Sequence, residues 1–247
     1  MRGEAPFHGP TGDSTTITRL WARPPAVPEP GYNRIMSAYP EAVFLKSAHQ
    51  PSQFVPDEGM EVAFAGRSNA GKSSAINLIV GRRQFARVSR TPGRTQLVNF
   101  FVLDERVPGG RRLVDLPGYG FARVPVKVQR HWRALMDGYF AQRRSLTGVV
   151  VIVDVRRGLL DLDRQMLAWA DAAGCAAHVL LTKADKLSRG AGAGVLQAAR
   201  RELGRSAGVQ LFSALDRTGL EEARLALESL MPVPVATLAG DDALTQQ

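Results

Sequence analysis

Residues 66–74 restrict the possible folds of this chain more than any other segment does. They combine two glycines with a Lys-Ser pair at the spacing of a phosphate-binding loop, between an apolar run and a helical pattern. Glycines let successive backbone N–H groups turn inward around phosphates, and the helix that follows adds its dipole. We therefore expect a nucleotide to be held by Gly66, Arg67, Ser68, Asn69, Ala70, Gly71, Lys72, Ser73 and Ser74.

Within this loop, Lys72 is expected to reach the β- and γ-phosphates, and the Ser73 hydroxyl to bind Mg²⁺. A second motif, Asp115-Leu116-Pro117-Gly118, follows the apolar pair Leu113-Val114. An Asp at this position holds Mg²⁺, usually through water, while the Gly118 N–H can reach the γ-phosphate. The tetrapeptide is common by chance, so its weight comes from its place after the phosphate loop.

The base is indicated by the motif Thr182-Lys183-Ala184-Asp185, directly after an apolar run. The Asp185 carboxylate can accept hydrogen bonds from guanine N1–H and the exocyclic N2, which adenine lacks. The Lys183 stem can lie along the purine face. A site built around a buried acceptor rejects the base that leaves it unpaired, by about 10⁴-fold in analogous cases. The motif therefore predicts a guanine nucleotide.

Two further segments bear on this prediction. Asp154 also follows an apolar run, which is the pattern of the Mg²⁺ site in an ATPase, but the guanine motif favours a structural role for it. Phe212-Ser213-Ala214 follows the last apolar run, and its backbone N–H groups are expected to face the guanine O6. By itself this tripeptide carries little weight.

Strand and helix patterns alternate along the chain, which favours a doubly wound, mainly parallel sheet with its ligand at the carboxyl ends of the strands. The expected strands are Glu61–Ala65, Leu97–Leu103, Arg111–Leu116, Gly148–Val155, His178–Thr182 and Val209–Phe212. The expected helices are Ser73–Val80, Val128–Arg144, Leu160–Ala173, Gly194–Leu203 and Leu220–Met231.

The composition of the chain bears on the class of protein and on its cellular compartment. No apolar run reaches eighteen residues, so no membrane span is expected, and the single cysteine, Cys175, fits a reducing cytoplasm and a small core residue. Lys and Arg number 32 against 23 Asp and Glu, a formal charge of +9 that favours polyanion partners. Residues 1–35 are expected to form a disordered tail, which leaves Met36 as a possible start, and 232–247 a second loose tail.

Together the motifs look like those of a TRAFAC-class GTPase. Their detailed wording resembles the EngB family of ribosome-biogenesis GTPases, and the likeness runs from about Phe54 to Met231. The motifs that carry the resemblance are Gly66-Arg-Ser-Asn-Ala-Gly-Lys-Ser-Ser, Thr91-Pro-Gly-Arg-Thr-Gln96, Asp115-Leu-Pro-Gly-Tyr-Gly120 and Thr182-Lys-Ala-Asp185.

The resemblance implies a P-loop NTPase three-layer sandwich over residues 54–231, with six strands, the second antiparallel to the rest. It implies GTP/GDP and Mg²⁺ as ligands, and Lys72, Thr95 and Gly118 as the catalytic residues. Thr95 would be the switch threonine that binds Mg²⁺ beside Ser73 and Asp115, with Thr91 as its competitor. The nucleotide contacts implied around it are Gly93, Arg94, Thr95, Gln96 and Leu97.

Tyr119 stands where many GTPases place a water-orienting Gln. A phenol lacks the amide geometry needed to position water, so intrinsic hydrolysis is expected to be slow. Related families that lack this Gln use a monovalent cation, and Asn69 matches the residue that binds K⁺ there. K⁺ stimulation is therefore a hypothesis, beside a purely loop-stabilising role for Asn69.

The family resemblance implies that GTP binding sets association with the large ribosomal subunit or its precursor, and that hydrolysis sets release. A monomer is expected. Aromatic and basic side chains near the mobile loops are candidates for contact with ribosomal RNA, with binding that weakens steeply in salt. These are Arg82, Arg83, Arg87, Arg90, Arg94, Phe121, Arg123, Lys127, Arg130, His131, Trp132 and Arg133.

Other functions stay open at this point. The chain could be an RNA-binding module in which the nucleotide is structural, or a GTPase with a non-ribosomal effector. A modification enzyme is weakened because little chain remains outside the nucleotide domain, and an ATPase is weakened by the Thr182–Asp185 motif.

Overall fold

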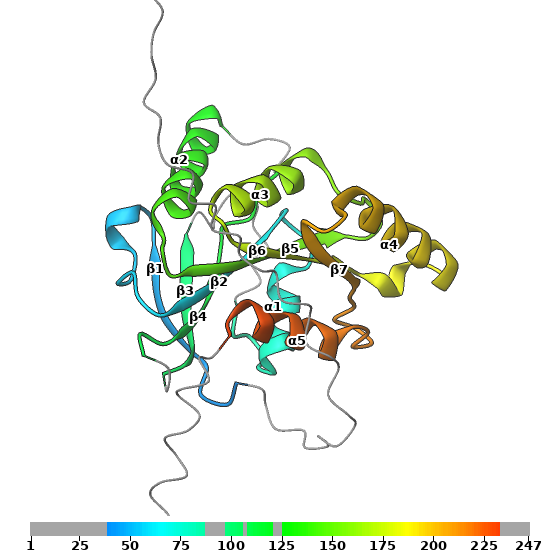
Figure 1. Ribbon diagram of the computed structural model, residues 1–247, viewed down its shortest axis with the longest axis horizontal. Coiled ribbons are helices and arrows are strands. Elements are labelled where there is room, and N and C mark those ends of the chain that lie inside the picture. The colour runs from blue at the N-terminus through cyan, green and yellow to red at the C-terminus, as the bar shows by residue number, and fades with distance from the viewer. Residues whose placement is uncertain (1–38, 87–96, 106–107, 121–124, 233–247) are drawn as a thin grey trace, which may run out of the picture. The chain divides into compact units, whose positions relative to one another are not determined.

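A sheet of seven strands, in the order β1-β3-β4-β2-β5-β6-β7, forms the centre of the part of the chain that the structure describes. The structure is a computed structural model, and it describes residues 39–86, 97–105, 108–120 and 125–232 (Figure 1). The strands are β1 (Val43–Ala48), β2 (Met60–Gly66), β3 (Val98–Asp104), β4 (Arg111–Asp115), β5 (Leu146–Asp154), β6 (Ala176–Thr182) and β7 (Ala207–Leu211).

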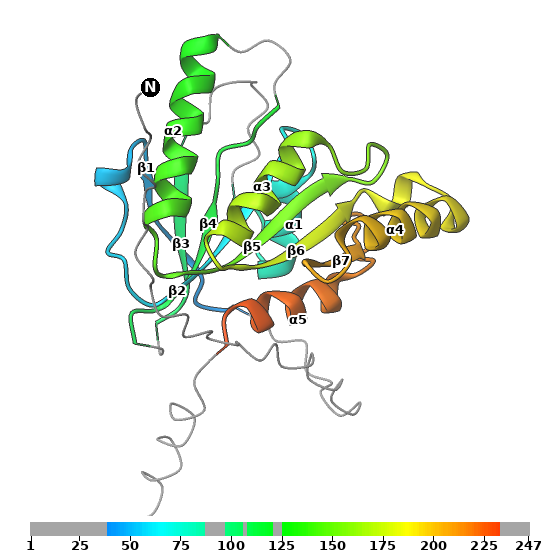
Figure 2. The ribbon, with the colours of Figure 1, turned by 45° about the horizontal axis from the view of Figure 1, so that its top comes forward.

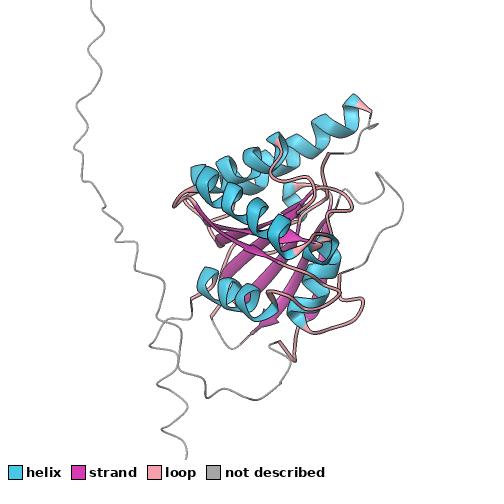
Figure 3. Cartoon of the chain, turned by 90° about the vertical axis from the view of Figure 1, so that its right-hand side faces the viewer, coloured by secondary structure: helices cyan, strands magenta, loops and turns pink. Residues whose placement is uncertain are grey.

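Helices cover both faces of this sheet, which gives the three-layer sandwich expected from the sequence (Figure 3). None of those within the described ranges has the length and apolar character to cross a membrane. They are α1 (Lys72–Val80), α2 (Val126–Gln142), α3 (Asp161–Ala172), α4 (Arg189–Leu203) and α5 (Leu220–Leu230), with 3-10 turns η1 (Pro51–Gln53) and η2 (Ala184–Lys186).

Two hydrophobic cores, one on each face of the sheet, explain this layering. Helices α2, α3 and α4 pack on one face, with Leu135, Met166 and Leu203 in the same buried cluster. Helices α1 and α5 pack on the other, through Ile76 and Leu227 among others. Strand β5 contributes alternate residues to both clusters, which is why its sequence is a continuous apolar run.

Strand β3 runs antiparallel to both of its neighbours, β1 and β4, and every other strand pair is parallel. The expectation of one antiparallel strand in a mainly parallel sheet is confirmed. The carboxyl ends of β2, β4, β5, β6 and β7 therefore share one edge of the sheet, where the motifs lie.

The sheet has seven strands rather than six because β1 was not expected. Its first three residues, Val43, Phe44 and Leu45, are all apolar, so they show no alternation of apolar and polar side chains. All three are exposed, at 48%, 55% and 46%. The strand lies at the edge, and a register shift between Phe44 and Lys46 interrupts its pairing with β3. Backbone pairing rather than a buried face defines this strand, and periodicity cannot detect it.

Helix α4 begins at Arg189, five residues before the expected Gly194. Glycines at 190, 192 and 194 are poor helix formers, and they masked the first turn in the sequence. The helix starts there because the Ser188 side chain accepts a hydrogen bond from the Ala191 N–H at 3.3 Å.

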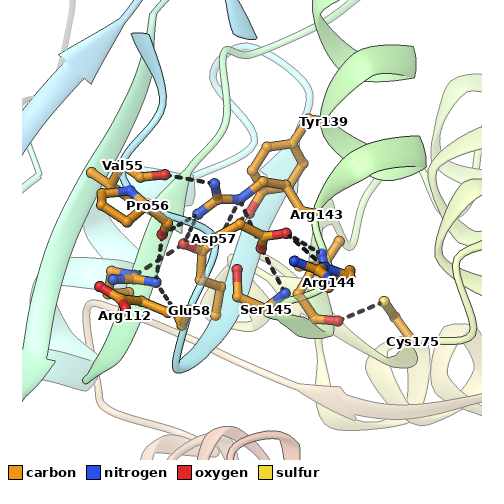
Figure 4. A network of polar contacts seen from close by, with 12 residues as sticks. Val55, Pro56, Asp57, Glu58, Arg112, Tyr139, Arg143, Arg144, Ser145 and Cys175 are labelled. Carbon is orange, nitrogen blue, oxygen red and sulfur yellow. Dashed lines mark hydrogen bonds and ion pairs between the residues drawn. The ribbon is translucent and has the colours of Figure 1, made fainter. Parts of the chain in front are cut away.

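A buried charge network closes the end of the sheet opposite to the motifs (Figure 4). Glu61, at the start of β2, is fully buried and pairs with Arg112 of β4 and with Arg143, the C-cap of α2. The Tyr139 hydroxyl of α2 donates to the same carboxylate at 3.2 Å. Two strands and the carboxyl end of α2 thus meet on one side chain.

The single cysteine is a core residue, as expected from the sequence. Cys175 is 8% exposed, and its thiol donates to the Leu146 carbonyl at 3.3 Å. Burial raises the pKa of the thiol to about 11, so it stays protonated near neutral pH.

Candidate functional site

The phosphate-binding loop runs from the last residue of β2, Gly66, to the first residue of α1, Lys72. Gly71 has a φ of 104° and Asn69 a φ of 63°, so the backbone reverses here through left-handed conformations. A Cβ at Gly66 would lie 2.9 Å from both the Cβ and the carbonyl oxygen of Ile152, so only glycine fits between β2 and β5. The loop has the strand-turn-helix context that its sequence predicts.

The two charged groups of the phosphate and metal motifs meet beside this loop. The Lys72 ammonium contacts the Asp115 carboxylate, and their side chains are only 12% and 8% exposed. Asp115 is the last residue of β4, opposite Phe64 of β2 in the parallel register. The Ser73 hydroxyl and the Asp115 carboxylate are the oxygen donors that Mg²⁺ prefers, so this donor set fits the metal.

Backbone hydrogen bonds dock the Asp115–Gly118 motif onto the phosphate loop. The Ser68 N–H donates to the Tyr119 carbonyl at 2.9 Å, and the Tyr119 N–H donates to the Gly66 carbonyl at 3.3 Å. A Cβ at Gly118 would lie 3.0 Å from the Ser68 hydroxyl oxygen. Gly118 therefore lies against the loop, as contact with a γ-phosphate requires.

The side chain of Tyr119 is buried and is directed away from the loop. Its hydroxyl donates to Asp163 of α3 at 2.7 Å, and its ring centroid lies 5.8 Å from that of Trp132. Burial raises the pKa of Asp163, and burial beside that carboxylate raises the pKa of Tyr119 well above its usual range. The phenol serves a structural contact, which agrees with the expectation that it does not orient water.

Helix α2 also contacts the Asp115–Gly118 motif directly. The indole N–H of Trp132 donates to the carbonyl of Pro117, a buried residue, at 3.2 Å. Neither Trp132 nor Asp163 was assigned to the site from the sequence. Both contacts join distant segments, and no local pattern marks them.

The guanine motif is braced against the phosphate loop by two of its own side chains. The Thr182 hydroxyl is within hydrogen-bonding distance of the Ala70 carbonyl and, at 3.0 Å, of the Val153 carbonyl. The Lys183 ammonium donates to the Asn69 carbonyl at 2.6 Å. The base-binding and phosphate-binding segments are therefore one connected unit.

The Asp185 carboxylate is held by groups on both sides. The hydroxyl of Ser213, a fully buried residue, donates to one oxygen at 2.8 Å, and Lys186 lies 3.0 Å from the other. These contacts, first the hydrogen bond from Ser213, lower the pKa of Asp185 below its usual value. The carboxylate is therefore ionised and oriented, as an acceptor for guanine must be.

The third segment of the base site differs in part from expectation. The Phe212 N–H donates to the Leu181 carbonyl at 2.9 Å, and the Ser213 N–H donates to the Thr218 carbonyl at 3.0 Å. Both groups are used within the fold, which leaves exposed Ala214 as the candidate donor to the guanine O6. Ser213 takes part through its hydroxyl instead.

Asp154 is not placed like a metal ligand. Its carboxylate is paired with Arg156 at 2.6 Å and with Lys183 at 2.9 Å. These contacts, first those from Arg156, hold the pKa of Asp154 well below its usual range. The structure thus supports the structural role that the sequence favoured, and it places that role beside the base motif.

Several expected site residues lie outside the described residues. These are Thr91, Gly93, Arg94, Thr95 and Gln96, together with Arg87, Arg90, Phe121 and Arg123 among the candidates for RNA contact. Leu97, the last residue of that motif, is described and half-buried.

The expected basic cluster divides between two places. The Arg82 guanidinium follows the carboxyl end of α1 and donates to the carbonyls of Pro40 and Ala42, so it anchors the entry to β1. Lys127, Arg130 and Arg133 are instead exposed on the first half of α2. Arg82 therefore does not belong to the same surface as the basic residues of α2.

A phosphate loop, an Asp-x-x-Gly motif docked on it and a braced guanine motif, at one edge of this sheet, define a P-loop GTPase. Residues 61–183 match the family described as 50S ribosome-binding GTPase. The probable GTP-binding protein EngB of Stenotrophomonas maltophilia is 56% identical over 182 residues, 72% of this chain and 89% of that protein. The chain belongs to the EngB family of GTP-binding proteins.

Other relatives agree. The probable GTP-binding protein EngB of Nitrosococcus oceani is 51% identical over 200 residues, 80% of this chain and 98% of that protein. The solved structure of a probable GTP-binding protein engB matches with a TM-score of 0.56 at 20% identity, over 69% of this chain and 98% of that chain. Aquifex aeolicus Era matches with a TM-score of 0.56 at 17% identity, over 70% and 57%. The two structures show the shared fold.

Proposed function

We propose that this GTPase is a molecular switch that acts in assembly of the large ribosomal subunit, with its GTP-bound form docking on the subunit or its precursor. The matched family is described as a 50S ribosome-binding GTPase. The chain also carries a formal charge of +9, which suits a ribosomal RNA partner. Because its partner would be the ribosome, such a switch would act in the cytoplasm. It would act as a monomer.

The observation that carries this proposal is the hydrogen bond from Trp132 to the Pro117 carbonyl. It joins α2 to the peptide next to Gly118, whose N–H would contact a γ-phosphate. A change at the γ-phosphate would therefore be passed to α2 through a single hydrogen bond. Such coupling of a phosphate contact to a packed helix is how switches convert hydrolysis into a change of surface.

The surface that would respond is the exposed side of the first half of α2. Lys127, Arg130 and Arg133 lie there, and His131 places its ring centroid 6.2 Å from that of His49 in the segment after β1. Exposed cations of this kind favour phosphate groups of RNA, with an affinity that falls steeply as salt rises.

The chemistry of hydrolysis would rest on few groups. Lys72 would hold the β- and γ-phosphates, and Ser73 and Asp115, with Thr95, would hold Mg²⁺, which neutralises phosphate charge when bound. Tyr119 is engaged with Asp163, so no side chain at that position orients water, and turnover would be slow. K⁺ held at Asn69 would raise it, and equal turnover in K⁺ and Na⁺ would remove this part of the proposal.

Sedimentation with purified ribosomal subunits tests the switch. We expect co-migration with the large subunit in a non-hydrolysable GTP analogue and its loss in GDP or at high salt. Co-migration with neither nucleotide would leave the GTPase in place but reject the assembly role in favour of another effector.

A second candidate is an RNA-binding module in which the nucleotide is structural. Lys72→Ala separates the two. A switch should lose nucleotide-dependent binding to the subunit, whereas a module with a structural nucleotide should keep binding if the variant folds.

A further inference from the structure

Asp154, the last residue of β5, is paired with two cationic side chains near the base motif, those of Arg156 and Lys183. Its Oδ1 accepts from the Arg156 backbone N–H at 3.1 Å and from Nε at 2.9 Å. Its Oδ2 accepts from Nη2 of the same arginine at 2.6 Å and from the Lys183 ammonium at 2.9 Å. The residue is 7% exposed, so this carboxylate faces its partners rather than solvent.

Lys183 is fixed at both ends by this arrangement. Its backbone is left-handed, with a φ of 60°, which is uncommon for a residue with a side chain. Its ammonium is held between Asp154 and the Asn69 carbonyl. The aliphatic stem between these two points therefore has little freedom, and it lies between the base motif and the phosphate loop.

Arg156 is the exposed member of the group. Its side chain is 49% exposed. The bidentate pair with Asp154 fixes the plane of its guanidinium. Arg157, the next residue, is also exposed, and its backbone N–H donates to the Asp154 carbonyl at 2.9 Å.

We propose that Asp154 is a positioning residue of the guanine site: it holds the Lys183 ammonium so that the lysine stem presents one fixed surface to the base. It does not touch the nucleotide, and its effect on affinity passes through Lys183. This role differs from that of the Asp185 carboxylate, which accepts hydrogen bonds from the base.

The test is a double-mutant cycle on nucleotide affinity. The full chain is measured with a fluorescent GDP as Asp154→Asn, Lys183→Met and the double variant. Asp154→Asn should weaken GDP roughly 10- to 100-fold, as expected for loss of a charged hydrogen bond, mainly through faster dissociation. In the Lys183→Met background, Asp154→Asn should weaken GDP affinity little further. Equal losses in both backgrounds would show that Asp154 acts independently of Lys183 and would overturn the proposal.

Two controls make the outcome specific. Arg157→Gln, a neighbouring exposed arginine, should keep the wild-type affinity. EDTA should accelerate GDP release from Asp154→Asn as strongly as from wild type, and a lost response to EDTA would make Asp154 a metal ligand instead. If thermal unfolding shows that Asp154→Asn is not folded, Asp154→Ser replaces it in the same cycle with the same expectations.

Discussion

The ammonium of Lys72 and the carboxylate of Asp115 form an ion pair between the first residue of α1 and the last residue of β4. One group belongs to the motif that is expected to hold phosphates and the other to the motif that is expected to hold Mg²⁺. Because both side chains have little exposure, each charge depends on a partner, and their proximity brings the two motifs together at one point.

Asp115→Asn should weaken the contribution of Mg²⁺ to nucleotide binding. A carboxylate that holds Mg²⁺ through water acts from the outer shell, and its loss costs about 10- to 100-fold in metal affinity. GDP dissociation measured across a Mg²⁺ titration should show this shift in midpoint. Asp137→Asn, on the exposed side of α2, is the control and should leave the midpoint unchanged. An unshifted midpoint in Asp115→Asn would place the metal elsewhere.

Asp185→Ala should remove the preference for guanine. The carboxylate is ionised and oriented by Ser213, so its removal leaves the base without its acceptor. The ratio of GDP to ADP affinity, measured by competition, should fall by up to about 10⁴-fold. Asp171→Ala, an exposed change on α3, should preserve the ratio. A retained ratio in Asp185→Ala would mean that backbone groups alone select the base.

Tyr119→Phe should affect stability more than hydrolysis. Without the hydroxyl, buried Asp163 keeps only the Leu160 N–H as a hydrogen-bond donor among those observed in the described residues. The free energy of unfolding in urea should fall by about 1–3 kcal/mol, the cost of an unsatisfied buried polar group. Single-turnover GTP hydrolysis should change little. A large loss of turnover at unchanged stability would assign the phenol to the chemistry.

Glu61→Gln should destabilise the fold without touching the nucleotide site. The fully buried Glu61 carboxylate is shared by Arg112 and Arg143, and removal of one partner from a buried ion pair costs about 3–5 kcal/mol. The midpoint of urea unfolding reports this loss. Glu41→Gln, at an exposed position, serves as the comparison and should match the wild type. A wild-type midpoint for Glu61→Gln would mean that its neutral amide satisfies both arginines.

Stability should fall as the pH drops below about 6.5, in part because of His178. Burial lowers the pKa of this histidine, although its Nε2 lies 2.9 Å from the Gln210 Oε1. The unfolded chain therefore binds more protons below pH 6.5 than the folded one does. The stability contribution is intact above that pH and is lost below it. Urea unfolding at several pH values gives the free energy of unfolding as a function of pH. Its slope below pH 6.5 should be shallower for His178→Gln than for the wild type, and an equal slope would exclude His178 as a source of the pH dependence.

The sequence predicted those parts of the site that are built from contiguous residues. Gly66, Lys72, Asp115 and Asp185 lie in short motifs whose spacing reflects local backbone geometry, so they could be assigned before any fold was known. Contacts between distant segments could not be assigned. Tyr119 and Asp163 are 44 residues apart, and Asp154 and Lys183 are 29 apart. Only the folded sheet brings such pairs together.

The fold was predictable to a similar degree, and for the same reason. Strand β5 is buried on both faces and has a continuous apolar run, whereas β1 is an exposed edge strand whose position depends on pairing with β3. Arg82 shows the same limit, because its charge suggested an RNA contact and its guanidinium serves the carbonyls near β1.

The Glu61 network has a mechanical consequence for helix α2. Figure 2 shows α2 beside the sheet. Tyr139 and Arg143 fasten the carboxyl end of the helix to the sheet, whereas Trp132, in its first half, donates to the Pro117 carbonyl. The helix of 17 residues, about 25 Å long, therefore connects the buried charge network with the peptide next to Gly118.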